Sequence, residues 1–165
     1  MLSKKMQDAL NGQLNAELYS SYLYLSMAAY FEAKNLPGMA HWMQVQAGEE
    51  KLHAMKFFGF IVDRAGRVTL TQIDGPETEW ESPLAVFKAA YAHEQKVTGL
   101  IGDLVKMAKE EPDVATDIFL QWFVTEQVEE EKSADEVVKK LTMIEKAPQL
   151  LLMMDKELGA RPGGE

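Results

Sequence analysis

Four long stretches of this sequence carry apolar residues at helical spacing, and each apolar stripe is interrupted near its middle by an acid. Apolar residues recur there in steps of three and four, which is typical of helices that bury one face. The interrupting acids are Glu17, Glu50, Glu94 and Glu130. The pattern predicts a helical bundle in which four carboxylates point inward at one level.

Local signals place the ends of the helices. Ser, Pro and Asp residues occupy the positions where helices are commonly capped or begin, and Gly follows the last periodic residue of the fifth segment. The predicted helices extend from Ser3 to about Lys34, from the NLPG break to about Arg64, from Ser82 to the EEPD break, from Asp113 to about Ile144, and over about residues 148–158.

The lengths of the connections predict the topology. Short links join the first helix to the second and the third to the fourth, so each pair is expected to be antiparallel. The link GRVTLTQIDGPETEWES is much longer. Extended, its roughly 17 residues span about 56 Å, which exceeds the roughly 42 Å length of a helix of about 28 residues. We therefore expect one all-α domain over residues 1–165, a ferritin-like four-helix bundle with an extended, packed crossover between the second and third helices.

The inward stripes bring further polar residues to the level of the four acids. The third stripe reads Leu84, Phe87, Tyr91, Glu94, Thr98, Ile101 and Val105, and Ser21 falls on the first stripe. The six residues expected to converge in the core are Glu17, Glu50, His53, Glu94, Gln127 and Glu130. No Lys or Arg lies on these stripes to pair with the acids. Burying a carboxylate without a partner costs on the order of several kcal/mol of folding free energy.

Two divalent cations would neutralise four carboxylates, and Glu50 is then the natural bridge between them. Oxygen ligands with one imidazole suit iron or manganese and accept zinc. The absence of cysteine excludes thiolate zinc sites and iron–sulfur clusters. Two alternatives remain, since single acids in apolar stripes are usually boundary residues, and a metal-free interaction bundle could satisfy its core acids otherwise.

The chain resembles non-haem prokaryotic ferritin over essentially its whole length, from LNAELYSSYLYLSMA through EEKLHAMKF and FLQWFVTEQVEEE to the fifth helix. The resemblance implies a first iron site at Glu17, Glu50 and His53 and a second at Glu50, Glu94 and Glu130, with Gln127 beside it. It implies a third iron site at Glu49, Glu126 and Glu129, although helical geometry alone places these three on a solvated face. Tyr24 matches a tyrosine near the first site that is often assigned a redox role, whereas its spacing alone indicates an ordinary core aromatic.

The same resemblance implies ferroxidase activity, in which Fe(II) is oxidised by O₂ or peroxide and deposited as mineral in a shell of 24 subunits. A haem is not expected, because Lys51 follows Glu50 and the fourth helix carries Gln127-x-x-Glu130, unlike bacterioferritins. The iron route differs from that of animal ferritins, since Asp117 is followed three residues later by Leu120. A small di-iron oxidase resembling rubrerythrin is the alternative, although that class normally adds a cysteine-rich module.

The remaining features bear on partners and location. The formal net charge is −9 without a basic stripe, so nucleic acid is not an expected partner. The sequence MLSKKMQDAL lacks the apolar region of a signal peptide and LLLMM is too short to span a bilayer, so a cytoplasmic protein with no membrane partner is expected. Residues 150–154 form an apolar face too wide for one bundle to bury, which predicts a homo-oligomer.

Overall fold

Local capping sets the beginning of three of the four long helices, as the sequence predicts. In the computed structural model, which describes residues 1–163, the side chains of Ser3, Ser82 and Asp113 each accept a hydrogen bond from the third backbone N–H that follows. The helices are α1 (Lys4–Ala33), α2 (Pro37–Asp63), α3 (Pro83–Glu110), α4 (Val114–Met143), a single 3-10 turn (Pro148–Leu150) and α5 (Leu151–Gly159). The predicted boundaries agree with these to within a few residues.

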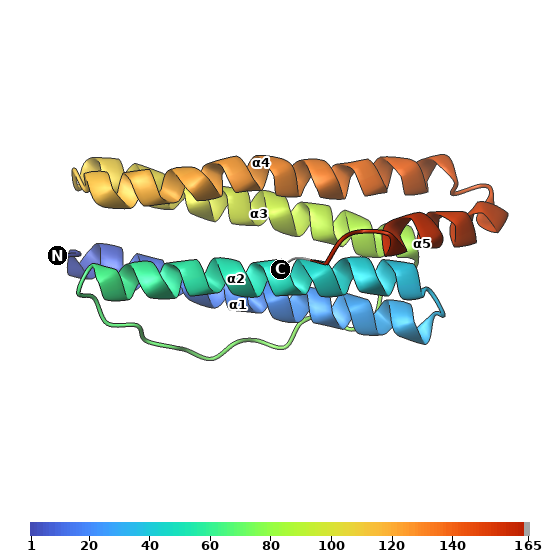
Figure 1. Cartoon of the computed structure of the whole chain (residues 1–165), viewed down its shortest axis with the longest axis horizontal. Helices are drawn as coiled ribbons and strands as arrows, with labels where there is room; N and C mark the ends of the chain where they lie inside the picture. The colour runs from blue at the N-terminus through green and yellow to red at the C-terminus, as the bar shows by residue number, and fades with distance from the viewer. Residues whose placement is uncertain (164–165) are drawn as a thin grey trace.

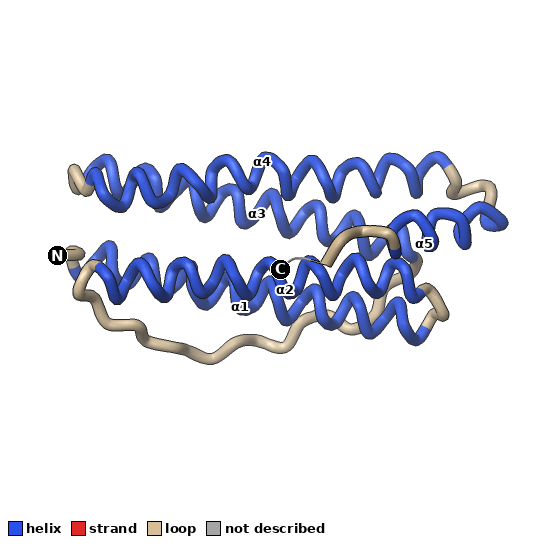
Figure 2. Tube along the Cα trace, in the orientation of Figure 1, coloured by secondary structure: helices blue, strands red, loops and turns tan. Residues whose placement is uncertain are grey.

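Two antiparallel pairs of helices form the bundle. Helices α1 and α2 pack together, α3 and α4 pack together, and α1 contacts α3 (Figure 1). The crossover returns the chain along the outside of the α1–α2 pair, so that α3 begins at the end of the bundle where α2 also begins (Figure 2). The predicted all-α bundle with one long crossover is confirmed. None of the described helices is both long and apolar enough to span a membrane.

The crossover is extended, but it is packed only in part. Val68 and Trp80, near its two ends, lie against the apolar core. Between them the side chains of Leu70 and Ile73 are 65% and 36% exposed. The middle of the segment is instead held through its backbone, whose carbonyl oxygens accept hydrogen bonds from α1, among them that of Thr71 from Asn15. The expectation of a packed crossover is therefore correct for its ends and wrong for its middle.

Helix α5 packs across the beginning of α2, where no local side chain caps the helix. The carboxylate of Asp155 on α5 accepts hydrogen bonds from the backbone N–H groups of Gly38 at 3.1 Å and Met39 at 2.8 Å. This approach requires glycine, because a Cβ on Gly38 would lie 1.8 Å from the backbone oxygen of Asp155. A carboxylate at a helix N-terminus satisfies free N–H groups and complements the helix dipole.

The packing of α5 on α2 buries part of the predicted apolar face at residues 150–154 and leaves another part exposed. Met154 is buried against the chain's own bundle, whereas Leu152 and Met153 are each 70% exposed. Met154 was therefore wrongly assigned to the face that needs a neighbour. The apolar surface that remains uncovered within one chain is formed by Leu150, Leu152 and Met153.

A polar layer divides the apolar core into two clusters. In α1, Leu14 belongs to one cluster and Leu23 to the other, and Glu17 lies between them in the sequence. The same order holds in α2, where Ala47 and Phe57 belong to different clusters and enclose Glu50. The bundle thus places the buried acids at a common level near the middle of the helices.

Candidate metal centre

The buried acids converge on Glu50, which belongs to two groups of possible metal ligands. Ligand atoms of Glu17, Glu50 and His53 lie within 4.8 Å of one another, and so do those of Glu50, Glu94 and Glu130. All five side chains are at most 6% exposed. Helical periodicity alone points each of them inward, and the packing of the four helices supplies the common level. The arrangement matches the predicted pair of sites that share Glu50.

Within the described part of the chain, no buried Lys or Arg pairs with these carboxylates. Among residues 1–163, the buried polar side chains include no Lys and no Arg. His53 lies with Nδ1 3.3 Å from Oε2 of Glu50. Several buried carboxylates without a countercharge are unfavourable unless they are protonated or bind a cation. The site is therefore suited to divalent cations with oxygen and nitrogen ligands.

Burial and the crowding of negative charges raise the pKa values of these carboxyl groups. Burial raises the pKa of Glu50 well above its usual range, and the neighbouring charges of Glu94 and Glu130 raise it further. Burial, followed by the charge of Glu94, raises the pKa of Glu130 to about 7. Burial and the charge of Glu50 raise the pKa of Glu17 in the same way. Binding of a metal requires the ionised forms, so it must release protons from this cluster.

Two glutamines one helical turn before the acids hold the carboxylates in place. Gln13 donates from Nε2 to Glu17 at 2.8 Å. Gln46 donates from Nε2 to Oε1 of Glu50 at 3.2 Å and to Oε2 of Glu130 at 2.5 Å. Neither glutamine is among the site residues expected from the sequence. The i,i+4 spacing of Gln and Glu on one helix face is the signal that could have identified them.

Gln127 and Tyr24 both donate hydrogen bonds to Glu94. Gln127 Nε2 lies 3.1 Å from Oε2 of Glu94, so its amide orients this carboxylate from beside the second group. A role for Gln127 in binding metal stays a prediction. The hydroxyl of the buried Tyr24 also donates to Glu94. Burial, followed by the charge of Glu94, raises the pKa of Tyr24 well above its usual range, so the phenol keeps its proton. The resemblance places Tyr24 near the first site, whereas its hydrogen-bond partner here belongs to the second.

The three residues predicted for a third site are not gathered in the structure. Glu49 forms an ion pair with Arg161 at 2.5 Å, and Glu129 lies 3.9 Å from Lys132. Glu126 instead forms a group with His53 and Glu130, in which ligand atoms lie within 4.8 Å of one another. The third site at Glu49, Glu126 and Glu129 stays a prediction.

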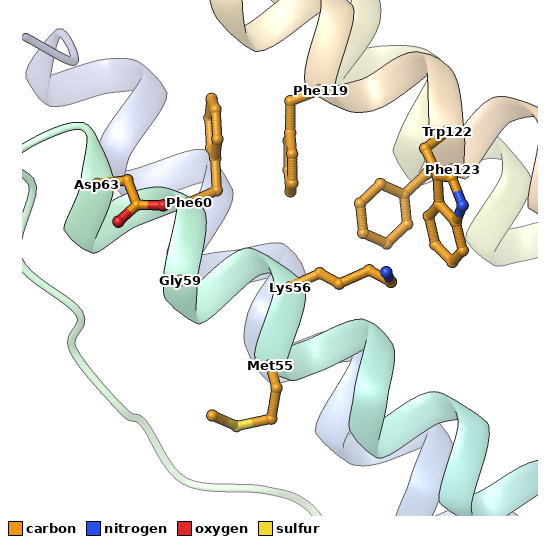
Figure 3. A pocket seen from close by; sticks show the side chains of 8 residues that line it. All are labelled: Met55, Lys56, Gly59, Phe60, Asp63, Phe119, Trp122 and Phe123. Carbon is orange, nitrogen blue, oxygen red and sulfur yellow. The ribbon is translucent and has the colours of Figure 1, made fainter. Parts of the chain in front are cut away.

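An aromatic wall between α2 and α4 adjoins the histidine. The ring centroids of His53 and Trp122 are 5.4 Å apart, and those of Phe60 and Phe119 are 3.9 Å apart in a parallel stack. These aromatic residues border a cleft of 330 Å³, and the side chain of Lys56 extends along it to lie over the Trp122 ring (Figure 3). The wall fixes the orientation of the imidazole beside the carboxylates.

Comparisons with known proteins agree with this geometry. Residues 7–144 match the family described as the ferritin-like domain. The chain is 43% identical to a bacterial non-heme ferritin of Bacteroides fragilis, over 98% of this chain and 100% of that protein. It is 37% identical to the bacterial non-heme ferritin of Staphylococcus aureus, over 98% of this chain and 97% of that protein.

Solved structures give the same result for the fold. An open pore ferritin of the hyperthermophilic archaeon Archaeoglobus fulgidus superposes with a TM-score of 0.97 at 53% identity, over 98% of each chain. An engineered closed form of the ferritin from that archaeon superposes with a TM-score of 0.98 at 52% identity, over 99% of this chain and 100% of that chain.

Proposed function

The chain belongs to the ferritin family, whose members store iron, and from that premise we propose that it oxidises Fe(II) at a pair of sites that share Glu50. The observation that carries the proposal is the cluster of four buried carboxylates and one imidazole without a buried Lys or Arg in residues 1–163. Glu17 and His53 would hold one ion, Glu94 and Glu130 the other, and Glu50 both.

The reaction we propose uses iron as the substrate. Two Fe(II) ions give two electrons to O₂, which takes up two protons and leaves as hydrogen peroxide, or to peroxide, which takes up two protons and leaves as two waters. Unequal ligand sets, with a histidine on one side only, suit iron that binds, is oxidised and moves on. We propose that the Fe(III) product is deposited as mineral inside a hollow homo-oligomer of 24 subunits.

The rubrerythrin-like alternative is not favoured. The family match covers residues 7–144 and both relatives match over nearly their full lengths. The sequence also contains no cysteine for an additional iron module. A cytoplasmic location stays a prediction.

The test of the proposal is Glu50→Ala, which removes the shared ligand. We expect the variant to lose fast Fe(II) oxidation in the first turnovers while it keeps its helix content. Stopped-flow absorbance after addition of two Fe(II) per subunit measures this loss. Glu136→Ala, which removes an exposed acid on α4, is the matched control and should oxidise iron at the parent rate. An unchanged initial rate in Glu50→Ala would exclude Glu50 as the shared ligand.

A further inference from the structure

The chain after α5 returns along α2 (Figure 1). It places the guanidinium of Arg161 beside Gln46, which contacts the carboxylates of the metal centre. His41 Nε2 lies 2.8 Å from the backbone oxygen of Arg161, which fixes this segment on α2. The Arg161 guanidinium lies over the Trp42 ring, 4.4 Å from its centroid. A cation over an aromatic face is attracted to the ring, and Arg favours this arrangement.

The guanidinium is also held by two polar side chains of α2. Arg161 donates from one terminal nitrogen to Oε1 of Gln46 at 3.0 Å and from the other to Oε2 of Glu49 at 2.5 Å. The side chain of Arg161 is 20% exposed. The ion pair, the Trp42 ring and a hydrogen bond to the backbone oxygen of Trp42 at 3.4 Å anchor the guanidinium, so that its hydrogen bond to Gln46 has a fixed direction.

Arg161 on one side of the Gln46 amide and two carboxylates on the other together fix which way the amide points. A guanidinium carries only donors, so the oxygen of the amide must face Arg161 and its nitrogen must face the opposite side. On that opposite side the nitrogen donates to Glu50 and to Glu130. Gln46 is 1% exposed, so water is not available to satisfy a reversed amide. A reversed amide would bring its oxygen against two carboxylates.

We propose that Arg161 is a positioning residue of the metal centre, acting through Gln46 to hold Glu50 and Glu130 ready for metal. This inference rests on the proposed function, since both carboxylates are the ligands assigned there. Hydrogen bonds from residues behind the ligands orient them, and their loss typically lowers metal affinity about 10- to 100-fold. Arg161 follows α5 in the chain, so the packing of α5 on α2 also places Arg161. Through Arg161 and Gln46 it influences the positions of Glu50 and Glu130.

The experiment measures Co(II) binding to the metal-free, full-length protein, because Co(II) reports ligand geometry without being oxidised by the site. We expect the parent to bind two Co(II) per subunit. Arg161→Met, which keeps the length of the side chain and removes its donors, should weaken Co(II) binding about 10-fold and change the visible absorption of bound Co(II). Lys140→Met is the matched control, because it removes the ion pair between α4 and Glu157 of α5 without touching Gln46, and should bind as the parent does.

A double-substitution cycle separates positioning from general loosening of the chain end. In the background of Gln46→Met, replacement of Arg161 should cause no further change in affinity or spectrum, because the residue through which it acts is gone. Arg161→Lys keeps the charge but replaces the planar guanidinium, whose two terminal nitrogens reach Gln46 and Glu49 separately, by a single nitrogen, so its Co(II) affinity should lie between those of the parent and Arg161→Met.

The outcomes distinguish this inference from the proposed function. If the parent binds two Co(II) and Arg161→Met binds them with the parent's affinity and spectrum, Arg161 does not position the site and the proposed function stands. Additive effects of the Gln46 and Arg161 substitutions would likewise overturn the inference, since Arg161 would then act by another route. If the parent binds no Co(II), the proposed function fails and the inference fails with it.

Discussion

Removal of one buried charge is expected to stabilise the metal-free protein, by an amount that grows as the pH rises. Glu130 is 6% exposed, and burial together with the charge of Glu94 raises its pKa from 4.5 to about 7. A carboxyl whose pKa is raised by folding favours the folded state while it is protonated, and this contribution is lost as the pH rises through the folded pKa. The substitution Glu130→Gln replaces the carboxyl by an amide of nearly equal shape that never ionises.

The magnitude follows from the two pKa values. Because the carboxyl of Glu130 ionises more readily in the unfolded chain than in the folded one, it lowers the free energy of unfolding by about 3 kcal/mol at pH 8 and by about 1 kcal/mol at pH 5.5, relative to acid. The metal-free Glu130→Gln protein should exceed the parent in stability by about these amounts. The amide oxygen can still accept the hydrogen bond from Gln46, and the amide nitrogen can donate to a neighbouring carboxylate.

Urea unfolding followed by circular dichroism measures the difference, with chelator present and the same subunit concentration for both proteins, because assembly also shifts apparent stability. Glu136→Gln, an exposed substitution on the same helix, is the control and should change stability little at either pH. A gain of equal size at pH 5.5 and pH 8, or a loss at pH 8, would refute the assignment of Glu130 as a buried charge without a partner. With divalent metal present the order should reverse, since the variant has lost a ligand.

Two further outcomes are expected. Leu152 and Met153 are each 70% exposed within one chain, so we expect light scattering coupled to size exclusion to give a 24-subunit particle, and replacement of both residues by Ser to weaken its assembly. A monomeric or dimeric parent at micromolar concentration would contradict mineral storage. Simultaneous replacement of Glu49, Glu126 and Glu129 by Gln should leave the paired sites occupied and change the number of iron ions bound, and anomalous diffraction from iron-soaked parent crystals should show metal beside these residues; no such peak would remove the third site.

The stability of the fold favours an apolar core, whereas the candidate binding site requires buried carboxylates within that core. Each carboxylate in the polar layer weakens the metal-free bundle, whereas the two apolar clusters on either side of that layer stabilise it. A core of this kind can carry buried acids near its middle because the helices extend well beyond them in both directions. The two apolar clusters therefore hold the four helices together on both sides of the acids.

Some of the inward-facing positions predicted from helical periodicity are wrong by one residue. Alternating steps of three and four predicted Tyr91, Thr98 and Val105 as inward residues of the third helix, and Ser21 of the first. The structure instead buries the preceding residues, Ala90, Val97, Leu104 and Ser20. On a helix of 3.6 residues per turn, a step of three residues falls about 60° short of a full turn and a step of four passes it by about 40°. The wrong choice between the two steps therefore selects a residue beside the buried one.

The sequence by itself determined the features that depend on short-range relations. Side-chain caps such as Ser82 act on the next helical turn, and inward positions such as Glu50 and His53 follow from spacing on one helix face. The length of the crossover then limited the topology to one bundle arrangement. From these relations the helices and the four buried acids could be predicted.

Only the tertiary structure decided which partners these residues take from distant parts of the chain. Asp155 caps α2 from more than a hundred residues away, Tyr24 donates to Glu94 of α3, and Arg161 sets the orientation of Gln46. Periodicity fixes the direction of a side chain around its own helix axis, but it gives neither the rotation nor the axial shift of a neighbouring helix. Those two quantities are set by the packing of whole helices against one another, and they decide which atoms come within hydrogen-bond distance.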